Sequence, residues 1–267
     1  MPGPGGIRSR PGAAGRGARL VCALVTLALT VAPAAAQLTE TVKRVKPAIV
    51  GVGTYLDIRR PPTKLMGTGF VVADGTYVVT NEHVVAQPLA DREQLGILVG
   101  TGSTAEFRAI QIVAREPGFD VAILRHKGPP LPALRLGDDD AVEEGQEIAF
   151  TGYPIGAVLG LFPVTHRGII SARTPVAIPV QRTRDLTPTM VRRLKQPFFV
   201  FQLDATAYPG NSGSPLYDQR SGEAVAIISS VFVKETKEQV LANPSGITFA
   251  VPIRYARELM REIGALR

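Results

Sequence analysis

The sequence predicts an all-β protein of the sandwich or barrel type, and three features of the 267-residue chain predict it. Short runs rich in Val, Ile, Phe and Thr recur along the chain, separated by turn-forming residues. Hydrophobic residues make up 45% and charged residues 20%, a balance typical of a globular protein with a sizeable core. Helical periodicity is confined to the two ends of the β-rich region, whereas an α/β sheet would alternate helices with strands.

Ten strand-like segments follow one another from residue 49 onward. They cover residues 49–55, 68–80 (with a turn at Asp74-Gly75), 95–100, 106–114, 120–125, 147–152, 166–172, 197–203, 223–232 and 247–252. Residues 124–146 are rich in proline and charge, and we interpret them as a linker between two halves. The sequence therefore predicts one β-rich domain over residues 37–140 and a second over residues 141–252.

Helices are expected at the two ends of this region. Residues 38–45 form one candidate, and residues 253–267 form a stronger one. In the second, apolar side chains lie near one helical face, and Gly264 is placed to end the helix: Ile253, Ala256, Leu259, Ile263 and Leu266. We expect this C-terminal helix to pack on a barrel.

Residues 1–36 have the order of a secretory signal: a basic start, an uncharged apolar run over residues 20–32, then small residues at Ala34 and Ala36. The apolar run is shorter than the roughly 20 residues of a membrane span, so we expect no stable span once the signal is removed. An uncleaved anchor or a transit peptide is the alternative. The only cysteine, Cys22, lies in this run, so a mature chain starting near Gln37 has no disulfide.

The positive charge of the chain is concentrated outside the predicted fold. The formal net charge is +7, but four arginines lie in the first 36 residues, which contain no acid. Removing that segment leaves 26 cations against 23 acids, a net charge of +3. Such an excess is too small to indicate a nucleic-acid or membrane-surface protein.

A serine in a glycine-flanked turn raises the question of catalysis. Ser212 lies in the stretch YPGNSGSPLYD, His83 follows the strand TYVVT, and Asp120 precedes the apolar strand VAIL. A buried carboxylate can hold an imidazole in one tautomer so that it accepts a serine proton, so we predict His83, Asp120 and Ser212 as a catalytic triad. The glycines allow a bend that directs the backbone N–H groups of Gly210 and Ser212 toward an oxyanion.

The chain order of these residues selects among known arrangements. His before Asp before Ser occurs in the chymotrypsin-type double barrel, whereas subtilisins and α/β-hydrolases have other orders. A pattern of glycines at residues 100–105 fits a dinucleotide loop, but a strand pattern and not a helix follows it. No His, Cys, Asp and Glu cluster has metal-ligand spacing. We therefore expect neither a cofactor nor a metal.

Three blocks carry a resemblance to a known family. TNEHVV (80–85), FDVAIL (119–124) and DATAYPGNSGSPL (204–216) resemble the catalytic blocks of trypsin-like serine endopeptidases, in particular the cysteine-free bacterial HtrA/Deg group. Further segments extend the resemblance over roughly residues 38–265: GTGFVV (67–72), GYPIG (152–156), RGIISA (167–172) and ITFAVPI (247–253). The resemblance implies a chymotrypsin-like double barrel with a C-terminal helix, polypeptide substrates, and export to the periplasm or cell exterior, with a role in protein quality control.

The sequence also departs from the family's pattern. Gly213-Ser214 replaces the usual Gly-Gly after the nucleophile, and Ile228 stands where glutamyl endopeptidases carry a histidine. The chain stops after the helix, where relatives usually continue into a PDZ domain. The expectation is therefore a protease domain alone. A non-catalytic peptide-binding or chaperone-like protein on the same fold, or an esterase, is the alternative.

The substrate pocket is expected to be small and apolar. Its predicted lining is Thr206, Ile228 and Phe249, which offers no charge to an Arg, Lys or Glu side chain, although His166 on a neighbouring strand remains a candidate for the wall. Cleavage is therefore expected after small or aliphatic residues. Residues 181–196 carry five cations and one acid, and this insertion is either a regulatory or substrate-steering loop or a solvated one.

Overall fold

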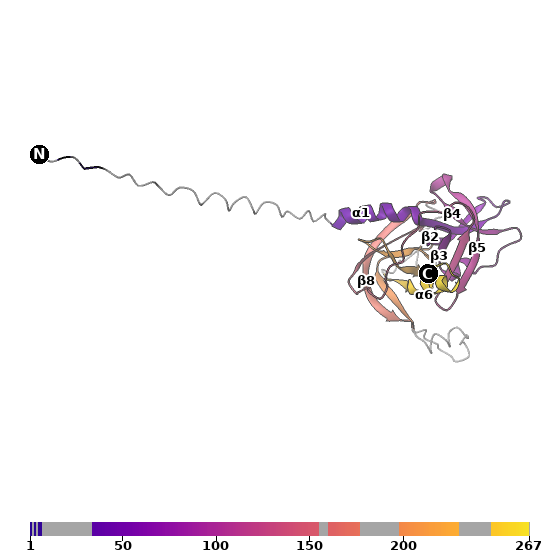
Figure 1. Ribbon diagram of the computed structural model, residues 1–267. Coiled ribbons are helices and arrows are strands. Elements are labelled where there is room, and N and C mark those ends of the chain that lie inside the picture. The colour runs from indigo at the N-terminus through magenta and orange to yellow at the C-terminus, as the bar shows by residue number, and fades with distance from the viewer. Residues whose placement is uncertain are drawn as a thin grey trace. The chain divides into compact units, whose positions relative to one another are not determined.

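Two closed antiparallel barrels form the body of the protein (Figure 1). The computed structural model describes residues 34–154, 160–176, 198–229 and 247–266, with Met1, Gly3, Gly5 and Gly6. The expected signal segment from residue 7 to residue 33, with Cys22, and the basic insertion 181–196 lie outside the described residues. The chain divides into one unit of residues 1–34 and another of residues 35–267, and both barrels belong to the second.

The first barrel has the strand order β1-β2-β3-β6-β5-β4. Its strands are β1 (Ile49–Tyr55), β2 (Thr63–Val72), β3 (Tyr77–Thr80), β4 (Gln94–Val99), β5 (Glu106–Glu116) and β6 (Val121–His126). Sequential strands pair antiparallel through β1–β2, β2–β3, β4–β5 and β5–β6, and β1 pairs with β4 to close the barrel. Closure leaves no unpaired sheet edge.

The second barrel has the order β10-β11-β12-β9-β8-β7. Its strands are β7 (Glu147–Gly152), β8 (Val164–Pro175), β9 (Phe199–Asp204), β10 (Pro215–Asp218), β11 (Ala224–Ser229) and β12 (Ile247–Pro252). A separate apolar core fills it, with Phe150, Phe201 and Leu216 fully buried. The expected all-β double barrel is confirmed, and the ten expected segments become twelve strands because 68–80 is two strands and β10 was not expected.

Short helices connect or flank the barrels. They are α1 (Ala34–Val45), a 3₁₀ turn over Lys46–Ala48, α2 (Glu82–Val85), a 3₁₀ turn over Gly102–Thr104 and α6 (Arg254–Glu262). Helix α1 begins four residues before the expected 38–45 segment. It lies against the second barrel, since the side chains of Thr41 and Arg44 both donate to the carbonyl of Arg220, at 3.3 and 3.1 Å.

Helix α6 confirms the expected C-terminal helix and joins it to the first barrel. The helix, yellow in Figure 1, contacts β5 and β6. Its Ala256 and Met260 are fully buried in the apolar cluster that contains the core residues of the first barrel. Tyr255 stacks on Phe119, with ring centroids 3.9 Å apart. Gly264 has a φ of +71°, and the next N–H, that of Ala265, donates to Met260 O at 2.8 Å, which ends the helix as a glycine cap does.

Candidate active site

His83 is carried by the four-residue helix α2, which begins two residues after β3 ends. Val84 and Val85 on this helix are buried and fix it to the first barrel. The His83 side chain keeps 32% of its surface exposed. The buried valines hold the helix rigidly while the imidazole stays accessible, an arrangement that suits a residue exchanging protons with a substrate.

Asp120 occupies the tight turn between β5 and β6, and its backbone has an unusual conformation. Its φ is +59°, in the left-handed region that a residue with a Cβ seldom adopts. The side-chain amide of Asn81 donates to the Asp120 carbonyl at 3.0 Å. This bond ties the Asp120 turn to the residue just before α2, so His83 and Asp120 share one local framework.

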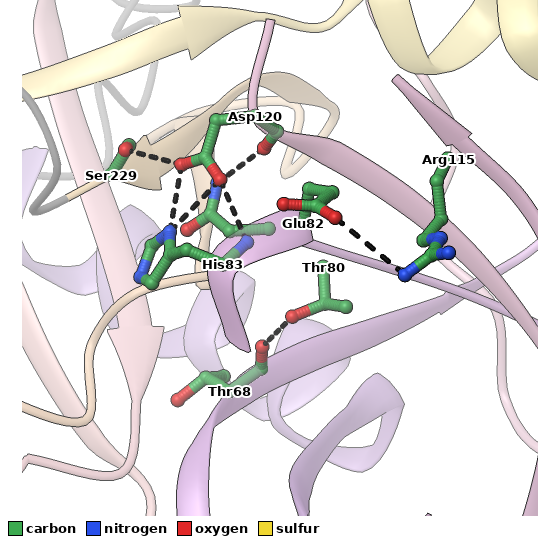
Figure 2. Close-up of polar contacts among 8 residues, drawn as sticks. Thr68, Thr80, Glu82, His83, Arg115, Asp120 and Ser229 are labelled. Atoms are coloured by element: carbon green, nitrogen blue, oxygen red, sulfur yellow. Dashed lines mark hydrogen bonds and ion pairs between the residues drawn. The ribbon is translucent and has the colours of Figure 1, made fainter. Parts of the chain in front are cut away.

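The Asp120 carboxylate is buried and receives donors from three groups (Figure 2). His83 Nδ1 lies 2.9 Å from both carboxylate oxygens, the His83 backbone N–H donates at 3.0 Å, and Ser229 Oγ donates at 2.7 Å. A carboxylate accepts hydrogen bonds and does not donate them, so His83 Nδ1 carries the proton of the His83–Asp120 hydrogen bond. In a neutral imidazole, Nε2 is then the nitrogen that can accept a proton. This is the tautomer that a general base requires.

Ser212 is the second residue of the second of two successive tight turns, 208–211 and 211–214, which answers why glycines surround it. Asn211 N donates to Tyr208 O and Ser214 N donates to Asn211 O, both at 2.9 Å. The third residue of each turn is a glycine with positive φ, +101° at Gly210 and +88° at Gly213. Type II turns require such a φ at that position, so the sequences YPGN and NSGS specify this double turn.

The double turn reaches the first barrel next to the histidine helix. Thr68 N on β2 donates to Ser212 O at 2.8 Å. A Cβ placed on Gly67 would lie 2.8 Å from Val84 Cγ2 on α2 and 2.9 Å from Ser212 O. The space between α2 and the Ser212 turn is therefore too small for a side chain. The structure thus joins His83 to Asp120 directly and brings the Ser212 turn to the same junction of the two barrels.

The trans peptide bonds of the double turn direct its N–H groups. Because Asn211 O is bonded to Ser214 N inside the turn, the Ser212 N–H of the same peptide points to the opposite side. Gly210 lies at the other end of this segment, where the positive φ reorients the chain. Gly210 and Ser212 therefore remain the predicted oxyanion donors.

The predicted pocket residues divide between two faces of the second barrel. Ile228 pairs with Ala250 and points into the core, where it is 1% exposed. Phe249 pairs with Ser229, and directly paired residues share a face, so Phe249 points the other way, with the residue that contacts Asp120. Phe249 and Ile228 thus lie on opposite faces of the paired strands, and their assignment to one pocket stays a prediction.

Thr248 supports the pocket loop and was missed by the sequence reasoning. Its side chain alternates to the same face as Ala250. The hydroxyl donates to Ala205 O at 2.6 Å and accepts from Ala207 N at 3.0 Å, and so holds both neighbours of Thr206. Thr248 therefore supports the position of Thr206, and the pocket lining of Thr206, Ile228 and Phe249 stays a prediction.

The other two histidines are bound into the barrels. His126 Nε2 donates to Gly75 O at 2.9 Å. His166 stacks on Phe150, with ring centroids 4.8 Å apart, and lies beside Tyr208, and burial lowers its pKa. Within the described ranges, no group of three or more His, Cys, Asp or Glu side chains could hold a metal ion.

The sequence and the double barrel are both similar to those of known proteins. Residues 67–227 match the family model described as "Trypsin-like peptidase domain". A "Probable periplasmic serine endoprotease DegP-like" of Pseudomonas putida (strain GB-1) is 31% identical over 205 residues, 77% of this chain and 36% of the relative. The corresponding protein of Halomonas elongata is 32% identical over 198 residues, 74% of this chain and 35% of the relative. The chain thus spans about a third of the length of these relatives.

Solved structures give the same result. The structure titled "HtrA-type protease AlgW with tripeptide" superposes with a TM-score of 0.61 at 27% identity, over 85% of this chain and 63% of the other. A second, titled with a decapeptide, gives a TM-score of 0.61 at 25% identity, over 85% of this chain and 67% of the other. The double barrel is accordingly of the chymotrypsin-like type, and the chain belongs to the family of trypsin-like peptidase domains.

Proposed function

We propose that this chain is a serine endopeptidase that hydrolyses peptide bonds through His83, Asp120 and Ser212. The observation that carries the proposal is the His83–Asp120 pair, with Nδ1 held by both carboxylate oxygens beside the Ser212 double turn. Relatives named serine endoproteases support it. The chemistry needs no cofactor.

The proposed reaction is acyl transfer in two steps. Ser212 Oγ attacks the scissile carbonyl while His83 Nε2 takes its proton, and the N–H groups of Gly210 and Ser212 stabilise the oxyanion. The imidazolium, stabilised by Asp120, then gives the proton to the leaving amine as the C–N bond breaks. In the second step, water attacks the acyl-enzyme while His83 Nε2 takes its proton. His83 then gives this proton to Ser212 Oγ as the ester C–O bond breaks.

Serine labelling tests the nucleophile. Ser212→Ala should lose reaction with a fluorophosphonate probe and lose peptide hydrolysis, while its melting temperature changes little. His83→Ala should lose a similar factor in kcat, roughly 10³ or more, because the triad acts as a unit. The matched control is Ser221→Ala in the exposed turn before β11, which should label like the wild type. Peptide hydrolysis retained in Ser212→Ala refutes the assignment.

Specificity is proposed to favour small or aliphatic residues before the cleaved bond. Thr206 and Ile228 carry no charge, and burying an unpaired charge against them is costly. Discrimination among aliphatic residues should be shallow, because one methylene contributes only about 1–3 kcal/mol. A peptide library cleaved by the mature chain measures this. A dominant Arg, Lys or Glu before the cut would contradict the pocket.

Export is proposed from the order of residues 1–36 and from the names of the relatives, which are called periplasmic. In the described part of the chain, no helix is long and apolar enough to cross a bilayer. N-terminal sequencing of the protein recovered from a secreting bacterium should give a chain that starts near Gln37. A cytoplasmic protein that keeps Met1 would contradict export.

A further inference from the structure

Thr68 makes two hydrogen bonds to the Ser212 turn in addition to those that pair its own strand in the first barrel. It lies on β2 and is fully buried. Its backbone N–H donates to Ser212 O at 2.8 Å, and its hydroxyl donates to Gly210 O at 2.7 Å. One residue of the first barrel therefore holds the carbonyls of both residues predicted to supply oxyanion donors.

These two bonds bracket the segment that joins the donor N–H groups. The Gly210–Asn211 peptide is held by Thr68 Oγ1 on its carbonyl and by Tyr208 O on its N–H. The Ser212–Gly213 peptide is held by Thr68 N on its carbonyl and by Ile228 O on its N–H. Glycine turns rotate easily, so the spacing of the two donors depends on these external bonds.

The hydroxyl proton of Thr68 is directed by the remaining contacts. Tyr153 N, at the end of β7, donates to Thr68 Oγ1 at 3.0 Å, so one lone pair is occupied and the proton is left for Gly210 O. Thr80 Oγ1 donates to the Thr68 carbonyl at 2.7 Å (Figure 2). Contacts from both barrels thus fix Thr68 in position beside the Ser212 turn.

We propose that Thr68 is a positioning residue for the reaction, in which its hydroxyl sets the orientation of the oxyanion donors of Gly210 and Ser212. This role rests on the proposed function, since it has meaning only if those N–H groups stabilise a tetrahedral intermediate. A hydroxyl that sets donor geometry affects the transition state more than the bound substrate, because the oxyanion forms only in the transition state.

The test compares Thr68→Val with Thr68→Ser and with Thr151→Val. Thr151 is also fully buried, and its hydroxyl bonds Thr165 on β8 and Tyr217 on β10. Thr68→Val should lower kcat by roughly tenfold or more, toward the roughly 10²–10³ lost when a donor is removed, with KM within about twofold. Affinity for a peptide boronate should fall in parallel, whereas affinity for a product peptide should not.

The conservative and control variants separate positioning from stability. Thr68→Ser keeps the hydroxyl and should retain kcat, and Thr151→Val should lose stability without losing kcat. If Thr68→Val does not fold, Thr68→Ala, which removes the same hydroxyl without an added methyl, takes its place with the same expectation. A wild-type kcat in the variant lacking the hydroxyl, an equal loss in Thr151→Val, or a change in KM alone overturns the role of Thr68.

The proposed function can fail separately. A wild-type chain that neither reacts with the fluorophosphonate nor cleaves peptides overturns the endopeptidase assignment and the role of Thr68 together. An active wild type with an equally active Thr68→Val overturns only the role of Thr68.

Discussion

Asp120 shows how a single residue is held in a conformation that its own sequence does not favour. A non-glycine residue at a φ of +59° is strained, by about 1–3 kcal/mol in general. The Asn81 amide on its carbonyl and three donors on its carboxylate hold it there. The strain places the carboxylate under the imidazole, so the neighbours of Asp120 are as necessary to the geometry as Asp120 itself.

Asn81 gives the prediction at this scale. Asn81→Ala leaves the Asp120 carbonyl without the buried amide donor, which should lower the free energy of unfolding by about 1–3 kcal/mol. It should also lower kcat, because the Asp120 turn is freer to relax from its left-handed conformation. Urea unfolding and steady-state kinetics measure the two effects. Unchanged stability and kcat would show that the turn holds itself.

The residues that chemistry demands were easier to find than those that geometry supplies. His83, Asp120 and Ser212 stand out because a serine nucleophile needs a base and an acid in a definite order. Ser229 and Thr68 have hydroxyls like many others, and their partners depend on strand registers set far along the chain. The face on which Phe249 lies likewise depends on strand register, because a shift of one residue reverses the face.

Elements with long apolar runs were predicted well, and the short ones were not. Strand β10 spans only Pro215–Asp218 and begins with proline, which donates no hydrogen bond and is tolerated at a strand's first residue. Its buried Leu216 and Tyr217 pair with both β7 and β11. Four residues are too few for a pattern, so only barrel closure identifies this strand.

Glu93, in the loop before β4, gives a prediction of pH dependence. It accepts from Thr54 Oγ1 on β1 at 2.5 Å, from Ala90 N at 3.0 Å and from Arg59 at 2.6 Å. The Thr54 hydrogen bond, followed by those from Ala90 and Arg59, lowers the pKa of Glu93 from 4.5 to about 2. A lowered pKa in the folded state stabilises the fold fully above pH 4.5 and loses that contribution as the pH falls toward about 2.

Glu93→Gln should therefore flatten the fall in unfolding free energy between pH 4.5 and about 2. Urea titrations across that range measure the slope. Glu40→Gln is the control, because Glu40 is exposed and pairs with exposed Lys43 in α1, a surface ion pair that contributes little to stability. A wild-type slope in Glu93→Gln would mean that other carboxylates govern acid unfolding.

At the scale of the whole molecule, the two barrels meet through contacts with almost no spare room. Gly67 separates Val84 on the histidine helix from the Ser212 carbonyl, and Gly213 lies against the Thr68 carbonyl. The relative position of His83 and Ser212, the proposed base and nucleophile, is therefore set by how closely the barrels approach. Small residues at the junction are what permit that approach.

Gly67→Ala tests this junction. The added Cβ would lie under 3.0 Å from both Val84 and Ser212 O, so one barrel must shift and kcat should fall by roughly tenfold or more. The control is Gly51→Ala in β1, whose Cβ would lie nearest to Leu65 and Leu98, both of the first barrel. That variant should lose stability and keep kcat. Equal kinetics in the two variants would contradict the importance of the junction.

The division of the proposed site between the barrels also orders its assembly as the chain folds. The first barrel carries the His83–Asp120 pair of the proposed triad, which precedes Ser212 in the chain. Ser212 belongs to the second barrel, whose closure requires β12 to pair with β9 and β11, and α6 packs back on β5 and β6. The proposed catalytic serine is therefore aligned only after the second barrel has closed, so a chain that has not finished folding should have no peptidase activity.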